Sequence, residues 1–343
     1  MNFLKSPGRI LFRSGVPSTV FIITIAVFIF IFYAIKKTEG NKPPTTVASP
    51  EIPAYNSIHE EGYELIRPLL LTETKGHDQS MSQLESQLNA MVTNYQSSGK
   101  AKDVSIYLKR FASAYPVEIN SSIQYFPGSL MKVPVLIGWL KKAESDPEVL
   151  DRKFILSDHF ITGKKLNLSD EPLQVGHTYT AKELLHYMIS ESSNDAVGIL
   201  LSNIEFEILQ KVFSDLSLPE PKDANALIFT DASSYSRFLR VLFNSSYLNR
   251  KSSQFALSLL QKTNFNKGIT ANTPDSIKVA HKFGESGSET EPQLHEAGIF
   301  YYKNEPYILV VMSRGNDFSI LSNILSEISD TVLQFMHKQS GEI

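Results

Sequence analysis

The 343-residue sequence contains no cysteine, a single tryptophan and little excess charge of either sign. Without cysteine, the chain can form no disulfide and offers neither a thiol nucleophile nor a thiolate ligand for a metal. The formal net charge of −3 lacks the basic excess of a typical nucleic-acid-binding domain, so we expect no nucleic-acid partner. The eight histidines include no pair at HExxH spacing, and we expect no metal and no other cofactor.

One long hydrophobic run is present, and it lies near the N-terminus. Residues 16–35 contain no charged side chain, and about 20 apolar residues suffice to cross a bilayer. We expect an uncleaved, single-pass transmembrane anchor there, preceded by a short cytoplasmic segment at 1–15. This predicts a protein of the cell membrane whose larger, C-terminal part is extracytoplasmic. A cleaved signal peptide is the alternative, although no A-x-A-like site follows the run before Lys36.

Beyond the anchor, four prolines and many small polar residues predict a linker over residues 36–60, followed by one folded domain at 61–343. Hydrophobic periodicity predicts strands at 103–110, 117–125, 277–283, 295–302 and 306–313. It predicts helices at 81–96, from Ser129 onward and at 318–337, and two helical stretches within 180–202 around a polar break at 190–195. This order favours an α+β fold, in which N- and C-terminal helices flank an antiparallel sheet and further helices form a subdomain.

Ser129 and Lys132 form an S-x-x-K sequence at the start of a predicted apolar helix. Positions i and i+3 of a helix share one face, so the lysine amine is expected beside the serine hydroxyl. A serine becomes an effective nucleophile when a base removes its proton, and burial near another cation favours a neutral lysine that can do so. A second S-x-x-K, from Ser97 to Lys100, closes a polar stretch without a following apolar helix, and we interpret it as a loop.

Two later motifs supply the other groups that an acyl-transfer site requires. The S-S-N sequence at 192–194 falls in a break between two predicted helices and supplies a second hydroxyl and an amide. The K-F-G sequence at 282–284 ends a predicted strand and supplies a cation beside a glycine. A nucleophile, its base, a hydroxyl that relays a proton, an amide clamp and an anion-binding lysine are together sufficient for acyl transfer.

The three motifs, in this order, resemble those of the class A serine β-lactamases and the related penicillin-binding D,D-peptidases, whose signatures are S-x-x-K, S-D-N and K-T-G. The segment EPLQVGHTYTAKELLHYMISESSNDAVGILL also resembles the family's stretch around S-D-N, and the resemblance covers roughly residues 81–338. It implies a β-lactamase/transpeptidase-like fold and a β-lactam or D-Ala-D-Ala peptide substrate. It also implies that Ser129 is acylated, Lys132 is its base and Ser192 relays the proton to the leaving nitrogen.

The resemblance also implies a substrate-binding set around the nucleophile. Asn194 would hold the substrate amide, and Lys282 would attract the substrate carboxylate. The backbone N–H groups of Ser129 and of Glu285, next to Gly284, would form the oxyanion hole.

Three departures from the family pattern bear on activity. Ser193 replaces the usual Asp of S-D-N, and Phe283 replaces the Thr or Ser of K-T-G, which removes a hydroxyl that could meet the substrate carboxylate and adds bulk. The stretch LSLPEPKDANALIFTDASSYSRF lacks the E-x-x-L-N loop whose Glu activates the deacylating water in class A enzymes. We interpret Glu220 and Asp223 in this stretch as solvated loop charges, so we expect acylation with slow hydrolysis.

Three alternatives to a β-lactamase remain open at this point: a D-alanyl-D-alanine peptidase acting on peptidoglycan, a β-lactam or peptidoglycan sensor without turnover, and a structural protein of the cell envelope. Two other polar residues receive no functional role. We interpret His281 as a strand-face residue and Glu296 as a charge at the edge of the sheet.

Overall fold

The computed structural model of the chain describes residues 53–59, 64–66, 69–77, 79–113, 115–160, 173–216, 218–222 and 229–339. The predicted anchor at 16–35 lies outside these residues. Among the helices of the described part, none is long and apolar enough to cross a membrane.

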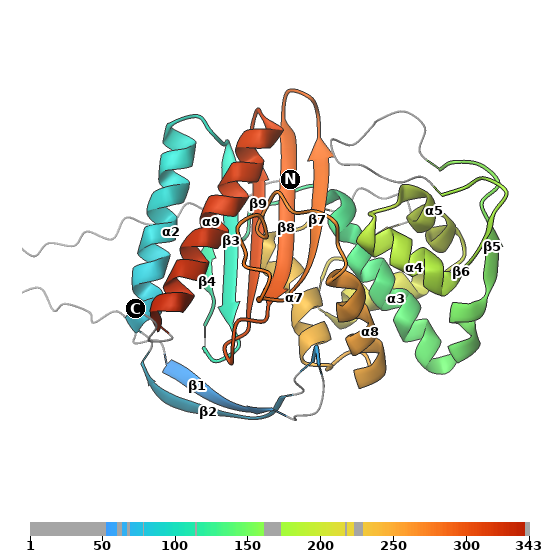
Figure 1. Cartoon of the computed structure of the whole chain (residues 1–343), viewed down its shortest axis with the longest axis horizontal. Coiled ribbons are helices and arrows are strands. Elements are labelled where there is room, and N and C mark those ends of the chain that lie inside the picture. Colours follow the sequence, from blue (N-terminus) through green and yellow to red (C-terminus); the bar gives the residue numbers. More distant parts are fainter. Residues whose placement is uncertain are drawn as a thin grey trace, which may run out of the picture. The chain divides into compact units, whose positions relative to one another are not determined.

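A five-stranded antiparallel sheet forms the centre of the domain (Figure 1). In sheet order its strands are β4 (Val117–Ile119), β3 (Asp103–Arg110), β9 (Tyr307–Arg314), β8 (Pro292–Phe300) and β7 (Val279–Gly287). Strand β7 is an edge strand, and it lies next to the segment that carries Ser129 and Lys132. The antiparallel arrangement predicted from the sequence is therefore confirmed.

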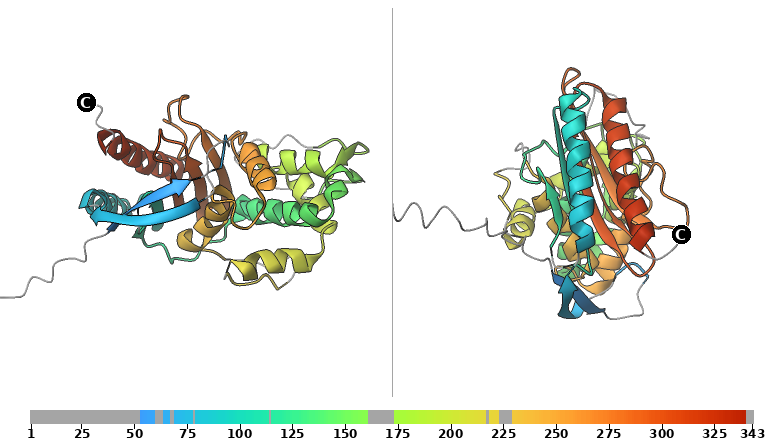
Figure 2. Two further views of the ribbon diagram at one scale, coloured as in Figure 1. Left: turned by 90° about the horizontal axis from the view of Figure 1, so that it is seen from below. Right: turned by 90° about the vertical axis from the view of Figure 1, so that its left-hand side faces the viewer.

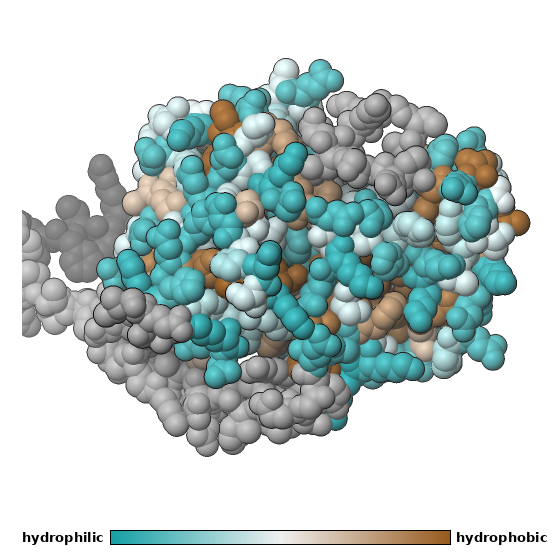
Figure 3. Space-filling view, viewed as in Figure 1, coloured by the Kyte–Doolittle hydropathy of each residue, from teal (hydrophilic) through white to brown (hydrophobic). Residues whose placement is uncertain are grey.

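Helices α2 (Gln79–Ser97) and α9 (Phe318–Gln339) cover one face of this sheet and lie side by side (Figure 2). Leu84 and Leu88 of α2, and Leu325 and Val332 of α9, are among the apolar side chains that recur at helical spacing and are buried against the sheet. Figure 3 shows hydrophilic side chains around scattered apolar ones on the side of the domain that faces the viewer in Figure 1. Both helices therefore bury their apolar side and present their polar side to solvent.

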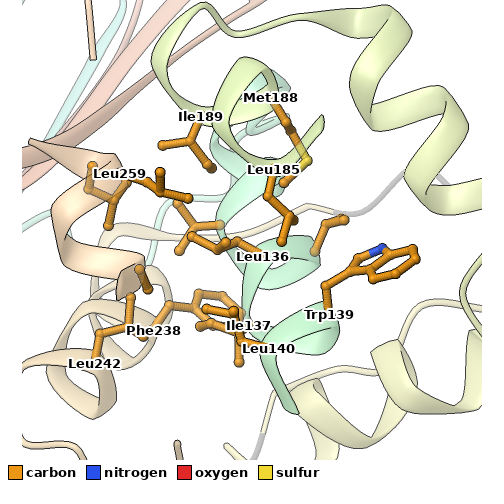
Figure 4. Packing of buried hydrophobic residues seen from close by; sticks show 14 of the residues in the cluster. Leu136, Ile137, Trp139, Leu140, Leu185, Met188, Ile189, Phe238, Leu242 and Leu259 are labelled. Carbon is orange, nitrogen blue, oxygen red and sulfur yellow. The ribbon is translucent and has the colours of Figure 1, made fainter. Parts of the chain in front are cut away.

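The other face of the sheet meets a helical subdomain. Its helices are α3 (Lys132–Ser145), α4 (Ala181–Ser190), α5 (Asn194–Ser202), α6 (Phe206–Asp215), α7 (Ala232–Phe243) and α8 (Arg250–Leu260). Figure 4 shows α3 at its centre, where Leu136 and Leu140 pack among side chains of α4, α7 and α8, including Met188, Phe238 and Leu259. Each such side chain contributes about 1.5–3 kcal/mol by its burial, so α3, which begins at Lys132, is a rigid support for the site.

One predicted strand is shorter than expected, and one strand lies where we predicted a linker. The strand expected at 117–125 ends at Ile119, because Asn120 has a left-handed φ of 50° that interrupts an extended chain. Strand β1 (Pro53–His59) lies within the predicted linker at 36–60 and pairs with β2 (Leu69–His77). A second small pair, β5 (Lys153–Ile155) and β6 (Thr178–Thr180), belongs to the helical subdomain.

Candidate active site

The turn that leads to Ser129 is fixed by its backbone. Tyr125 and Thr230 exchange two backbone hydrogen bonds, of 2.8 and 3.0 Å, which tie the turn to the chain just before α7. The N–H of Phe126 donates to Oε1 of Gln293 on β8 at 3.1 Å. Because the turn is anchored on two sides, the position of the next few residues is set by tertiary contacts.

The buried side chain of His295 also anchors this turn. His295 Nε2 donates to the carbonyl oxygen of Phe126 at 3.2 Å, while the N–H of Ser313 donates to His295 Nδ1 at 3.3 Å. Ser286 Oγ donates to the same Phe126 carbonyl at 2.5 Å. Burial lowers the pKa of His295 to about 3. The imidazole is therefore neutral near pH 7, and it serves as a fixed donor and acceptor.

Two glycines bring the turn into close contact with β7. Gly128 has a φ of +54°, and a Cβ at this position would lie 2.2 Å from the carbonyl oxygen of Glu285. A Cβ on Gly284 would lie 2.2 Å from the carbonyl oxygen of Pro127. Any side chain at either position would separate the two backbones. The structure thus brings Glu285 next to the residue that precedes Ser129, near the place that the family resemblance implied for it.

Ser129 lies in a short 3-10 turn, η1 (Gly128–Met131), directly before α3. Lys132, at the first position of α3, is 3% exposed, and its Nζ lies 3.0 Å from Ser129 Oγ. Nζ also lies 3.1 Å from Ser192 Oγ and 3.0 Å from Asn194 Oδ1, and it donates to the Ser192 carbonyl oxygen. One buried amine therefore contacts the expected nucleophile, the expected relay hydroxyl and the expected amide clamp.

Ser192 occupies the break between α4 and α5 in a left-handed conformation, with a φ of 57°. The side chain of the following residue, Ser193, accepts a hydrogen bond from the N–H of Ala196 at 3.2 Å and caps α5. Ser and Asp are both favourable caps. Ser193 thus has a structural role that either residue can fill, which explains how the S-D-N pattern tolerates Ser at its second position.

Lys282 is a second lysine in contact with Ser192. It is fully buried, and its Nζ lies 3.0 Å from Ser192 Oγ and 3.3 Å from the carbonyl oxygen of Phe283. The ring of Phe283 is 4.6 Å from that of Phe265, measured between centroids, and Phe283 is 5% exposed. The bulky ring of Phe283 is thus packed into the core on one side, while Lys282 Nζ lies 4.0 Å from its centroid.

A dipeptide that the sequence did not reveal links the two motifs. Thr263 Oγ1 donates to the carbonyl oxygen of His281, directly before Lys282, at 2.7 Å. The N–H of Asn264 donates to the Ser190 carbonyl oxygen at 3.2 Å, and Asn264 Nδ2 donates to the Glu191 carboxylate directly before Ser192. This Thr-Asn pair therefore bridges the segments that carry Ser192 and Lys282. Nothing in its local sequence pattern distinguishes it from an ordinary loop.

The comparisons with known proteins agree with this geometry. A sequence model of the beta-lactamase enzyme family matches residues 83–336. The chain belongs to this family, and it is a serine hydrolase. Beta-lactamase VEB-1 of Pseudomonas aeruginosa is 24% identical over 259 residues, which cover 70% of this chain and 85% of that protein.

Solved structures show the same fold at low sequence identity. A mutant of PBP-A, determined as an acyl-enzyme complex with penicillin G, has a TM-score of 0.63 and 17% identity and covers 75% of this chain and 97% of its own. A representative class A beta-lactamase from Bacteroides cellulosilyticus has a TM-score of 0.65 and 18% identity, with coverage of 76% and 100%. The β-lactamase/transpeptidase-like fold is therefore confirmed.

Within this β-lactamase-family fold, the prediction for Glu296 is wrong. Glu296 is fully buried because β8 is an interior strand of the sheet. Its carboxylate contacts His281 Nδ1 at 2.6 Å and accepts a hydrogen bond from the N–H of Ile269 at 2.7 Å. The contact pair of Glu296 and His281 therefore links the loop around Ile269 to strand β7. Among the described residues, no group of three or more His, Cys, Asp or Glu side chains is placed to hold a metal.

The stretch that lacks E-x-x-L-N is described in part. Glu220 is exposed, as expected for a solvated loop charge, while Asp223 lies outside the described residues. Phe229 is 55% exposed, and its ring lies 6.1 Å from that of Phe126 in an edge-on arrangement. This segment of the β-lactamase-family chain therefore contacts the turn before Ser129 through an aromatic pair.

Proposed function

We propose that the chain opens β-lactam amides through an acyl-enzyme at Ser129 and releases the product slowly. The observation that carries this proposal is the 3.0 Å separation of Lys132 Nζ from Ser129 Oγ, within a buried cluster that also contains Ser192 and Asn194. A lysine within hydrogen-bond distance of a serine is the arrangement required for a base and its nucleophile.

Acylation would use the contacts of Lys132 in sequence. Its neutral amine takes the proton of Ser129, whose Oγ forms a bond to the carbonyl carbon of the lactam. The C–N bond of the lactam then breaks, and Ser192 donates its proton to the leaving nitrogen. Lys132 returns a proton to Ser192 across their 3.1 Å contact, so no proton is gained or lost overall.

The negative oxygen that forms during this attack would be stabilised by backbone donors. The N–H groups of Ser129 and Glu285 are the candidates, and the close contact that Gly128 and Gly284 permit supports this assignment. Asn194, whose Oδ1 accepts from Lys132, would hold the substrate amide through its amide group. Lys282 would orient Ser192 through their 3.0 Å contact.

Slow deacylation follows from the missing E-x-x-L-N loop, because Glu220 is exposed and the sequence supplies no equivalent Glu at that place. The same feature favours a second candidate, a D-alanyl-D-alanine peptidase acting on peptidoglycan stem peptides. The two candidates share the acylation step and differ in whether water readily releases a β-lactam acyl group.

An intact-mass time course with penicillin G tests the proposal. The full chain should gain the mass of one penicillin and keep it through many minutes, and Ser129→Ala should gain none. Ser97→Ala, which alters the exposed S-x-x-K at the end of α2, is the matched control and should react as the wild type does. A wild-type chain without adduct contradicts the proposal, and rapid turnover of a chromogenic cephalosporin contradicts the slow release.

We also propose that residues 16–35 anchor the chain in the cell membrane and place the hydrolase domain outside the cytoplasm. The support is the uncharged hydrophobic run itself. Fractionation of cells that express the full chain, followed by external protease treatment of spheroplasts, tests both parts. Recovery of the intact chain in the soluble fraction contradicts the anchor, and resistance to external protease contradicts the orientation.

A further inference from the structure

Lys282 is fully buried, and its positive charge is already surrounded by groups of the protein. Its Nζ lies 3.0 Å from Ser192 Oγ, 3.3 Å from the carbonyl oxygen of Phe283 and 4.0 Å from the centroid of the Phe283 ring. An ammonium has three N–H donors, and an aromatic face within about 6 Å attracts a cation. Two oxygens and a ring therefore occupy the surroundings of this lysine.

Packing in the hydrophobic core fixes the position of the Phe283 ring. It is 5% exposed and belongs to the hydrophobic cluster beneath α9, where its ring lies 4.6 Å from that of Phe265. Moving the ring away from Lys282 would break this packing and expose an apolar side chain, which is unfavourable in water. The ring therefore covers Lys282 as part of the folded core.

A lysine binds a carboxylate tightly when one of its N–H groups points at the carboxylate and neighbouring hydroxyls donate further hydrogen bonds to it. Phe283 offers no side-chain donor and leaves Lys282 enclosed. We propose that Phe283 closes the anion subsite beside Lys282, so that the site takes neutral acyl donors, β-lactams and amides without an adjacent carboxylate, as readily as carboxylated ones. This inference rests on the proposed acylation of Ser129, and it leaves Lys282 to act on Ser192.

The test compares two β-lactams, penicillin G and its methyl ester, in which a methyl group replaces the negative charge of the carboxylate. With either one, Ser129 Oγ bonds to the lactam carbonyl carbon, the C–N bond breaks and the nitrogen takes the proton from Ser192. The second-order rate constant for adduct formation on the full chain is measured for both by intact mass. We expect the two to agree within about threefold, since a hydrogen bond to a charged group would contribute tenfold or more.

A wild-type chain that reacts about tenfold or more faster with the free acid overturns this inference while leaving the proposed function intact. A chain that forms no adduct with either compound contradicts the proposed function itself. The wild-type ratio is decisive even where a variant fails to fold, because it requires no substitution.

Substitutions then test whether the Phe283 ring causes the similar rates with the free acid and the ester. Phe283→Thr should raise the acid-to-ester ratio by about tenfold or more, and Phe283→Leu, which removes the ring without adding a donor, should raise it less. Phe300→Leu is the control, because Phe300 is a buried ring of the same cluster that stacks on Tyr307 and makes no ring contact with Lys282 among the interactions described. An unchanged ratio in Phe283→Thr contradicts the assignment. The ratio is measured within each protein, so a smaller folded fraction does not alter it.

Discussion

Lys132 and Lys282 direct their Nζ atoms at one oxygen, the hydroxyl of Ser192, from distances of 3.1 and 3.0 Å. A hydroxyl oxygen has two lone pairs and one proton. When both lysines donate to Ser192, both lone pairs are used and its proton is turned toward a third partner. In the proposed reaction, that partner is the leaving nitrogen.

Removal of the Ser192 hydroxyl should therefore slow acylation strongly. Ser192→Gly is the preferred substitution, because Ser192 has a φ of 57° that glycine adopts without strain. We expect the rate of adduct formation with penicillin G to fall by about 100-fold or more, the usual contribution of a positioned proton donor. Stopped reactions analysed by intact mass provide the rate, and a variant as fast as the wild type would show that Ser192 relays no proton.

The close approach of Gly128 to Glu285 should be essential for acylation. Gly128→Ala places a Cβ 2.2 Å from the Glu285 carbonyl oxygen, so the backbones must separate and the proposed oxyanion hole must widen. We expect acylation to fall by about 100-fold, as when an oxyanion donor is removed. Gly99→Ala is the control, because it has a similar φ of +72° but no atom within 4 Å of the added Cβ. It should lose about 1–2 kcal/mol of stability through backbone strain and acylate normally.

The bridge made by Asn264 should influence rate more than stability. Asn264→Ala removes the hydrogen bond to the Glu191 carboxylate and loosens the segment that carries Ser192. We expect acylation to slow by about tenfold, corresponding to one hydrogen bond to a charged group. In the control Asn272→Ala, a similar side chain that bonds Asp330 and Ser326 of α9 is lost, and acylation should not change. Equal rates in the two variants would remove Asn264 from the positioning of the site.

His295 should make the stability of the domain depend on pH. Its pKa is lowered to about 3 in the folded protein, while in the unfolded chain it is near 6.5, so the unfolded state binds more protons between these values. The free energy of unfolding should therefore decrease as pH falls from about 6.5 toward 3, by about 1.4 kcal/mol per pH unit from this residue.

Urea unfolding of the wild type and of His295→Gln between pH 4 and pH 7 measures this slope. Glutamine retains one donor for the Phe126 carbonyl and one acceptor for the Ser313 N–H, and it does not titrate. The variant should lose the slope that His295 contributes. Identical slopes in the two proteins would mean that His295 is protonated equally in the folded and unfolded chains.

Local features of the fold and site were predictable because they depend on near neighbours in the chain. The apolar spacing of Leu84 and Leu88 predicted α2, and its apolar face is buried as that spacing requires. Polar groups inside the sheet were harder to interpret. Glu296 stands between His295 and Ala297 in a strand, and only the position of β8 between two other strands makes it a buried partner of His281.

The sequence by itself determined that Ser129 and Lys132 lie together. Side chains three positions apart on a helical turn are neighbours, so the amine lies beside the hydroxyl whatever surrounds them. It also determined the presence and order of the other motifs. Only the tertiary structure decided that Ser192 and Lys282 meet, since they are 90 positions apart and are joined by a bridge at Thr263 and Asn264. It also decided the orientation of Phe283, because the space that a ring occupies depends on the residues packed around it.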